Sequence, residues 1–412
     1  MVRNGSPTRR SVLLSGLCAS LLSARVQAQD VPELVLQDGP QILPPFKVKR
    51  GEIFRLRVKN ERHAPTAFHW RGVRLRNDMD GGAPLTQKPI SPGETFDVAF
   101  TPPDSGTFLC HANWRANSAS DIADGVIFPF LVEDDKDPAV DADLMLLLQE
   151  KKSNGAATLG MTINGSEMAP THDLRPGARV RLRIASGSTQ RIMSVALEGT
   201  KSRVAAIDGQ PCGLFEPDRQ TLPLVPGQRY DLFFDLPRED GHEVSLHLRS
   251  LGGDTKAASL LASFRTSGEL VAERPTFAGL PSNSLLPEKI ALQSAMRRDL
   301  VFARNSSGGW LINGQAGDAF APTPLFKVKR GTPVVLGFIN KTGQPQLIHP
   351  HGHVMRHIHL FDDGWDPYWR DTIIVPERRT MRVAFVADNP GRWPLNGGMD
   401  GRDGPTSWFE VS

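Results

Sequence analysis

Cysteine is scarce in this chain of 412 residues, which has only three: Cys18, Cys110 and Cys212. Cys18 lies in an N-terminal segment that we expect to be removed, so at most one disulfide remains available. In an oxidising compartment Cys110 and Cys212 could pair. We favour the interpretation that they are two buried thiols in different domains, because free cysteine packs as a small apolar residue. Both states stay open at this level.

Long apolar runs and long amphipathic helices are also missing. Hydrophobic residues make up 39% and charged residues 23% of the chain, as in soluble globular proteins. Its 38 glycines and 33 prolines favour many turns and short strands over long helices. A chain of this length exceeds one compact core, so two or three domains are expected.

The N-terminal segment has the features of an export signal. A twin-arginine sequence at residues 8–14 is followed by an apolar run to Ala24 and by small residues at 26–28. The apolar run is too short to span a bilayer, which argues against the alternative of a membrane anchor. We therefore expect residues 1–28 to be a twin-arginine signal peptide, a periplasmic location and no membrane span after cleavage.

The basic character of the full chain is largely a property of that segment. It holds four arginines and no acidic residue, so its removal changes the formal net charge from +3 to −1. A nearly neutral mature chain gives no reason to expect nucleic acid or an anionic membrane as a partner.

One pattern occurs three times along the chain. The hexapeptide Phe46–Gly51 recurs unchanged at Phe326–Gly331, and a weaker copy ends at Pro176-Gly177. Each copy precedes a strand-like run, and such long-period self-similarity indicates tandem copies of one domain. Short strands punctuated by Pro-Gly turns favour β-sandwiches, and an ordinary immunoglobulin-like array is the alternative.

We therefore predict an all-β chain of three tandem Greek-key β-sandwich domains. Their expected ranges are residues 29–137, 138–280 and 281–412, with an acidic linker at residues 133–138 marking the first boundary.

Four short motifs stand in the first and last copies, and histidine is prominent in three of them. They are residues 68–72 (FHWRG), 110–113 (CHAN), 346–353 (QLIHPHGH) and 396–402 (NGGMDGR). Residues two apart in a strand point to the same face, so His-X-His brings two imidazoles to one cavity. Imidazole is a ligand for several transition-metal ions, Cu(II) among them, so these motifs are candidate metal-binding segments.

In this register the motifs resemble the four copper-binding motifs of multicopper oxidases. The resemblance covers nearly all of the mature chain, through segments 69–132, 207–211 and 346–411. It implies three cupredoxin-like domains. Active members of the family take electrons from substrate at a type 1 copper. They reduce dioxygen to water at a cluster of one type 2 and two type 3 coppers, held by eight histidines.

The resemblance also implies which residues stand at the ligand positions of that cluster. His69 and His349 match the two type 2 ligands. The type 3 positions are occupied by Arg71, His111 and Gly398 for one copper, and by Asn113, His351 and Asn396 for the other. The candidate residual copper ligands are therefore His69, His111, His349 and His351, and no catalytic residue is assigned.

The type 1 positions have lost every sound ligand. The resemblance places Gln346, Gly397 and Arg402 there, with Pro405 or Ser407 where the family has methionine. Without the family's thiolate, which Gly397 replaces, electrons have no way into the protein, so we expect no laccase-type turnover.

Arg71 brings a permanent positive charge to a place built for cations. A buried charge needs a partner, and we expect Asp400 or Asp403 to pair with it.

Two functions of different classes remain. The favoured one is a copper-free binding or scaffold protein without oxidase activity, with another periplasmic or cell-envelope protein as partner. It resembles the copper-free branch of the family exemplified by the cell-division protein SufI. The alternative is a type 2-like protein that holds at most one copper at His69 and His349 and serves copper handling or a minor redox reaction. A full oxidase comes third.

A separate His-X-His pair follows at His357 and His359. An uninterrupted strand would place it on the same side as His349, His351 and His353, but turns usually break such long runs. We expect solvated or packed histidines here, and a surface metal patch is the alternative.

Overall fold

A computed structural model describes most of the chain. The described residues are 31–39, 41, 43–112, 126–151, 160–188, 191–249, 259–317, 319–359, 364–398 and 404–412. The expected signal peptide and the positions Asn113, Asp400, Arg402 and Asp403 lie outside them. Within the described part, none of the helices combines the length and apolar character that a membrane span requires.

The first part of the chain forms two sheets that enclose an apolar core. One has the order β1-β3-β5, from β1 (Glu33–Leu36), β3 (Phe54–Asn60) and β5 (Thr95–Phe100). The other has the order β2-β7-β6-β4, from β2 (Phe46–Lys49), β7 (Ile127–Glu133), β6 (Gly106–Ala112) and β4 (Phe68–Arg71). A short 3-10 helix, η1 (Asn77–Met79), follows β4.

The middle part forms a second pair of sheets around a core of its own. The six-stranded sheet has the order β14-β13-β16-β11-β8-β9, from β14 (Gln210–Phe215), β13 (Arg203–Ile207), β16 (Arg229–Asp235), β11 (Arg179–Ser186), β8 (Ala142–Lys151) and β9 (Gly160–Ile163). The five-stranded sheet has the order β10-β18-β17-β12-β15, from β10 (Thr171–Leu174), β18 (Ser259–Thr266), β17 (Glu243–Arg249), β12 (Met193–Glu198) and β15 (Thr221–Leu224). The 3-10 helix η2 (Asp218–Gln220) precedes β15.

The last part forms the third pair of sheets. The six-stranded sheet has the order β21-β20-β19-β23-β27-β25, from β21 (Gln315–Ala316), β20 (Trp310–Ile312), β19 (Met296–Arg304), β23 (Pro333–Asn340), β27 (Thr380–Val386) and β25 (Arg356–Ile358). The five-stranded sheet has the order β22-β29-β28-β24-β26, from β22 (Lys327–Val328), β29 (Thr406–Val411), β28 (Gly391–Gly397), β24 (Gln346–Pro350) and β26 (Ile373–Val375). The 3-10 helix η4 (Leu292–Ser294) precedes β19.

The sequence repeat corresponds to a repeated topology. Strands β2, β10 and β22, which lie in or beside the three copies of the pattern, each pair in parallel with the closing strand of their own sandwich. The prediction of an all-β chain of three sandwiches is confirmed. The boundaries near residues 137 and 280 stay predictions, and they fall between β7 and β8 and between β18 and β19.

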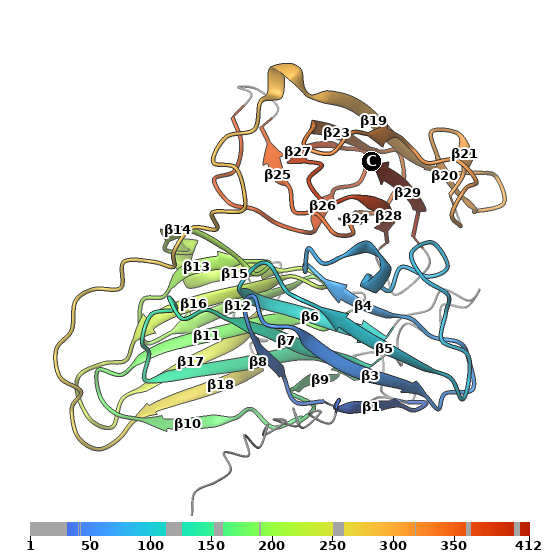
Figure 1. Cartoon of the computed structure of the whole chain (residues 1–412). Coiled ribbons are helices and arrows are strands. Elements are labelled where there is room, and N and C mark those ends of the chain that lie inside the picture. The colour runs from blue at the N-terminus through green and yellow to red at the C-terminus, as the bar shows by residue number, and fades with distance from the viewer. Residues whose placement is uncertain are drawn as a thin grey trace, which may run out of the picture.

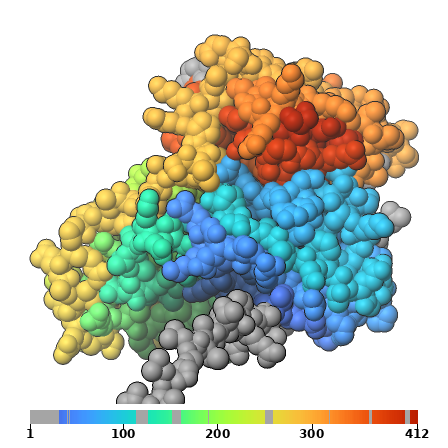
Figure 2. Space-filling view, viewed as in Figure 1, coloured from blue at the N-terminus to red at the C-terminus, as the bar shows by residue number. Residues whose placement is uncertain are grey.

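The third sandwich lies across the other two. Figure 1 shows β24, β26 and β28 on the side of the third sandwich that faces β4 and β14. In the space-filling view of Figure 2, the orange and red surface of this sandwich rests directly on the blue surface of the first. The residues of the first and third sandwiches that carry the histidine motifs therefore meet at one interface.

A buried guanidinium joins all three sandwiches. Arg229 of β16 forms an ion pair with Asp371 of the third sandwich, with Nη2 and Oδ2 2.7 Å apart and both side chains 0% exposed. Its Nε donates to the carbonyl of Thr107 in the first sandwich at 3.1 Å, and its Nη1 lies 3.6 Å from Oδ1 of Asp208 in the second. Gly72 lies against this pair with φ +85, and a Cβ there would overlap both charged groups. Domain docking therefore depends on one charge network.

Two carboxylates share this network and have opposite pKa shifts. Burial and the neighbouring Asp371 raise the pKa of Asp208 to about 6. Burial also acts to raise the pKa of Asp371, but Arg229 outweighs it and holds this carboxyl below its ordinary range. Asp208 is thus the carboxyl of the pair that takes up a proton first as the pH falls.

Replacing Arg229 by Met should lower the free energy of unfolding by about 3–5 kcal/mol, because buried carboxylates would lose their counter-charge. The control is Arg57→Met, which removes an exposed Arg–Asp pair with Asp97 at 2.7 Å and should leave the urea midpoint close to wild type. Urea unfolding followed by tryptophan fluorescence measures both. Equal midpoints for the two variants would contradict the importance of the buried pair.

Replacing Asp208 by Asn should change the pH dependence of stability. With a folded pKa of about 6 against an ordinary 3.8, Asp208 contributes stability that is present below the lower value and lost as the pH rises through the higher one. The melting temperature of Asp208→Asn, relative to wild type, should therefore rise as the pH is raised from about 4 to about 7, a range that spans the two pKa values. A relative melting temperature that falls over that range would contradict the assignment.

Candidate metal centre

The histidine motifs lie on paired strands. In the first sandwich β4 pairs with β6, and His69 stands opposite His111. In the third sandwich β24 pairs with β28, and His349 stands opposite Asn396. The two strand pairs face each other across the domain interface. One ring nitrogen from each of His69, His349 and His351 therefore lies within 4.8 Å of the others. The ring of His111 is 5.2 Å from that of His69.

His69 and His349 present their outer nitrogens to each other. Nδ1 of His69 donates to the carbonyl of Asp80 at 2.9 Å, and Nδ1 of His349 donates to the carbonyl of Asp371 at 2.7 Å. A neutral imidazole that donates from Nδ1 carries a lone pair on Nε2. The two Nε2 atoms are 3.1 Å apart, so the outer nitrogens of two histidines from different domains converge on one point. A cation bonded to both nitrogens at about 2 Å fits this separation.

His351 completes the group and is oriented by Asp80. Its ring stacks on His69 with centroids 3.8 Å apart, and its Nδ1 lies 2.8 Å from Oδ2 of Asp80. Its Nε2 accepts a hydrogen bond from the amide of Asn396 at 2.9 Å. Burial opposes ionisation of Asp80, but His351 and His69 outweigh it and hold the pKa of the carboxyl below its ordinary range. Asp80 thus fixes one histidine through its main chain and another through its side chain.

The cavity keeps most of its imidazoles neutral. Burial lowers the pKa of His349 and of His111 well below the ordinary value, and it lowers the pKa of His351 to about 4. The charge of Arg71 acts in the same direction on all three. Neutral imidazole is the form that binds metal ions, so these groups are in the ligand state at neutral pH.

Arg71 lies beside the cavity and against the junction of the domains. Its Nη2 donates to Oγ1 of Thr372 at 2.6 Å, and its Nε lies 3.9 Å from Oδ1 of Asp371. The predicted partners, Asp400 and Asp403, lie outside the described residues. Asp371, which the sequence analysis did not single out as a partner, is the carboxylate that the structure places beside Arg71.

The position that corresponds to the type 1 cysteine has no room for a thiolate. Gly397 pairs with Ile348, and a Cβ built on it would lie 2.7 Å from Cγ of Pro405 and 3.0 Å from Cδ1 of Ile348. Gln346 is buried and its amide nitrogen lies 3.3 Å from the carbonyl of Gln344. Arg402 lies outside the described residues. Among the described residues, Pro405 and Ile348 would therefore collide with a cysteine at position 397.

The two described cysteines are far along the chain from that position. Cys110 is buried in the core of the first sandwich, Cys212 lies in β14, and both are free thiols. Burial raises the pKa of Cys212 to about 12 and the pKa of Cys110 well above its ordinary value. Both therefore remain protonated, the form that does not bind copper.

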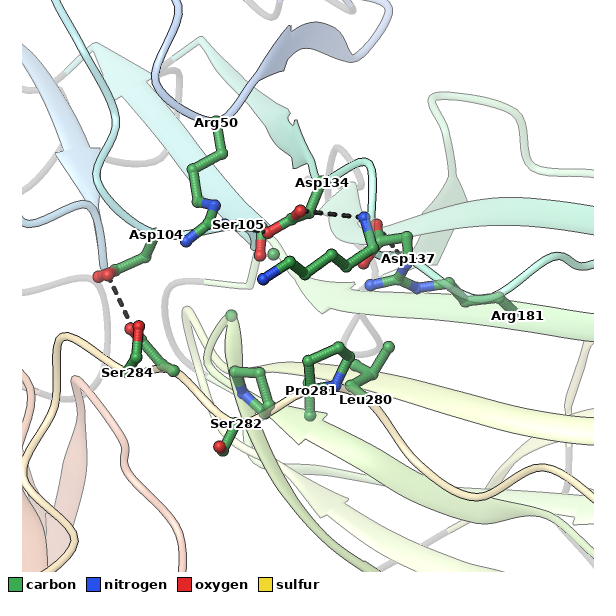
Figure 3. Close-up of a pocket in the computed structure, with 16 residues that line it drawn as sticks. Arg50, Asp104, Ser105, Asp134, Asp137, Arg181, Leu280, Pro281, Ser282 and Ser284 are labelled. Atoms are coloured by element: carbon green, nitrogen blue, oxygen red, sulfur yellow. Dashed lines mark hydrogen bonds and ion pairs between the residues drawn. The ribbon is translucent and has the colours of Figure 1, made fainter.

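A separate polar cavity of about 130 Å³ lies between the first sandwich, the second sandwich and the segment 280–284. Figure 3 shows charged side chains converging on it, and these are paired: Arg50 with Asp134 at 2.7 Å and Arg181 with Asp137 at 3.0 Å. Histidine and cysteine do not occur among the described residues that line it. It is therefore distinct from the metal centre.

Comparisons with known proteins agree with this geometry. Residues 23–137, 141–243 and 286–400 match three family models, each described as multicopper oxidase. The multicopper oxidase MmcO of Mycobacterium tuberculosis is 26% identical over 406 residues, which cover 86% of this chain and 78% of that protein. Laccase-1 of Fomitopsis schrenkii is 25% identical, over 92% of this chain and 83% of that protein.

Solved structures give the same result. The structure of Lac15 from a marine microbial metagenome has a TM-score of 0.76 and 27% identity, and the match covers 92% of this chain and 100% of that one. A multi-copper oxidase from Pseudomonas Thermotolerans has the same TM-score and identity, with 92% and 99% covered. The three sandwiches are thus cupredoxin domains, and the chain belongs to the multicopper oxidase family.

Proposed function

We propose that this chain is an exported member of the family that does not turn over as an oxidase and that holds a single copper ion between its first and third domains. The ligands are His69 and His349, and His351, whose Nε2 accepts a hydrogen bond from Asn396, packs beside them. The observation that supports this function is the convergence of the two Nε2 atoms, 3.1 Å apart, with both Nδ1 atoms held by main-chain carbonyls. The geometry thus favours the mononuclear alternative over the copper-free scaffold.

The donor set suits copper. Imidazole is a good ligand for Cu(II), and ligand histidines ordinarily donate their second nitrogen to a carbonyl or carboxylate, as His69, His349 and His351 do. When bound, the ion would supply a Lewis acid or a one-electron redox centre at this cavity. The protein's own groups hold His349 and His351 neutral and orient all three imidazoles, and burial of His69 and His349 limits the access of water.

The replaced positions restrict the cavity to one ion. Arg71 puts a permanent charge next to the histidines, and further cations are repelled by it. Gly398 has no side chain, and Asn396 uses its amide to donate to His351. A pair of type 3 coppers therefore has too few ligands among the described residues.

Loss of oxidase turnover follows from the type 1 position. Pro405 and Ile348 fill the space beside Gly397, so the place where the family accepts electrons from substrate is a packed core. The twin-arginine sequence supports export to the periplasm, where the protein meets its copper or its partner.

A second candidate is the copper-free scaffold that binds another cell-envelope protein. The contact that favours it is the hydrogen bond from Asn396 to Nε2 of His351, which satisfies that nitrogen without a metal. Arg71 also weakens cation binding, because its charge acts on His349 and His351.

Copper stoichiometry tests the two candidates. The mature protein is stripped with a chelator, loaded with Cu(II), desalted and analysed for copper per chain and by EPR. Wild type should hold one copper per chain more than His349→Ala, with a type 2 spectrum, and the matched control His63→Ala, an exposed histidine, should equal wild type. Equal copper content in wild type and His349→Ala would contradict the single-copper function and support the copper-free scaffold. A blue species with phenol oxidation would overturn both.

Restoring the missing cysteine alone should not restore a type 1 site. Gly397→Cys should give no intense visible charge-transfer band after copper loading, because Pro405 occupies the space and Gln346 is not an imidazole. It should also lower the melting temperature through overpacking. The control is Gly213→Cys, where nothing lies within 4 Å of an added Cβ. A blue band in Gly397→Cys, absent from the control, would show that the site is latent.

A further inference from the structure

A short hairpin in the third domain gathers two histidines and a carboxylate away from the central cavity. The main-chain N–H of His359 donates to Gly364 at 2.7 Å, and that of Asp366 donates to His357 at 2.9 Å. Ile358 and Trp365 form a bridge between these two bonds. The pairing therefore sets His357 opposite Asp366 and His359 opposite Gly364.

This register places the three side chains on one face. Residues two apart in a strand share a face, and directly opposed residues are cross-strand neighbours. Asp366 is accordingly 3.5 Å from Nδ1 of His357 and 3.2 Å from Nε2 of His359, measured to its two carboxylate oxygens. One ligand atom from each of the three residues lies within 4.8 Å of the others. Gly364, opposite His359, has no side chain to fill the space between them.

Asp366 is held in place by groups outside the triad. Nη2 of Arg370 lies 3.0 Å from Oδ2 of Asp366, and the guanidinium of Arg370 lies over the ring of Tyr368 at 4.8 Å. Tyr368 in turn stacks on Phe215 of β14, with ring centroids 6.3 Å apart. The carboxylate is thus oriented by an outer partner, as carboxylate ligands of metals commonly are, and it keeps lone pairs for an ion.

The triad is open to solvent in a way that suits an exchangeable ion. The side chain of His359 is 44% exposed, whereas His357 and Asp366 are 19% and 17% exposed. His63, which faces the single carboxylate of Asp38, is 97% exposed and shows what a solvated histidine of this chain is like. The triad differs from this His63–Asp38 pair because it has three donor groups that converge and only His359 is largely exposed.

We propose that His357, His359 and Asp366 form a second metal site, which takes a divalent first-row transition-metal ion such as Cu(II) or Zn(II). Two imidazoles and one carboxylate are the donor set of open mononuclear sites for these ions, and Cu(II) binds most tightly in the general order of affinities. The site shares no residue with the cavity between the domains. Its ion exchanges with solvent through the exposed side of His359.

The test uses a background in which the central cavity is disabled. His349→Ala protein is stripped, and its binding of Cu(II) and of Zn(II) is measured separately by equilibrium dialysis. One ion per chain is expected. Adding His359→Ala should weaken binding at least about ten-fold, whereas adding His63→Ala should not change it. His359 is exposed enough for its replacement to leave the fold intact, which a thermal melt checks.

Three outcomes decide the matter. Loss of the bound ion on His359→Ala alone supports the site. Dissociation constants that agree within about two-fold, too small a change for loss of a ligand, would overturn it, and so would equal weakening by His63→Ala, since that indicates non-specific binding by surface histidines. In the wild-type background, His359→Ala leaves the copper of the central cavity in place, so the failure of either proposal can be recognised without the other.

Discussion

The ion pair between Arg229 and Asp371 is the contact on which the rest of the molecule depends. One guanidinium with no solvent exposure reaches a carbonyl of the first domain, a carboxylate of the second and a carboxylate of the third. Asp371 also supplies the main-chain carbonyl that orients His349. The group that docks the third domain is therefore the residue that aims one of its histidines, and a shift of docking would displace the ligand.

Asp80 performs the matching task on the other side of the interface. Its carbonyl orients His69 and its carboxylate orients His351, so one loop residue positions ligands from two domains. Arg71 adds a third constraint, because its charge lies against Thr372 and Asp371 at the edge of the same cavity. A cation of the protein thus lies beside the histidines and contacts Asp371, which also orients His349.

Strand periodicity in the sequence predicted much of this arrangement. The repeated hexapeptide corresponds to β2 and β22, which pair in parallel with the closing strands of their domains. The resemblance to multicopper oxidases implied that His69, His349 and His351 share one cavity, and strand alternation accounts only for His349 and His351 lying on one face. That Gly397 stands where the family has its cysteine is an interpretation of the motif by resemblance. That its place is filled by Pro405 required the structure, since packing across a turn has no periodic signature.

Other parts of the site could not be predicted for physical reasons. Asp80 and Asp371 act through loops, and which carbonyl of a loop meets an imidazole depends on domain docking, a long-range property. The expected partners of Arg71 were Asp400 and Asp403, in the stretch of the fourth motif, whereas Asp371 comes from the segment after Trp369. Asp366 joins His357 and His359 only because a hairpin fixes the register, and the sequence pattern of alternating histidines does not include the returning strand.

His69 and His349 belong to different domains, and this has a consequence for mechanics rather than chemistry. An ion between them acts as a cross-link, since it binds the docked state and not the separated one, and its binding free energy adds to the cohesion of the whole molecule. Two neighbouring contacts would then hold the interface together. One is the Arg229–Asp371 ion pair, and the other is the metal ion, which a chelator removes. The two imidazoles would then form a link between the domains that closes or opens with the copper concentration around the protein.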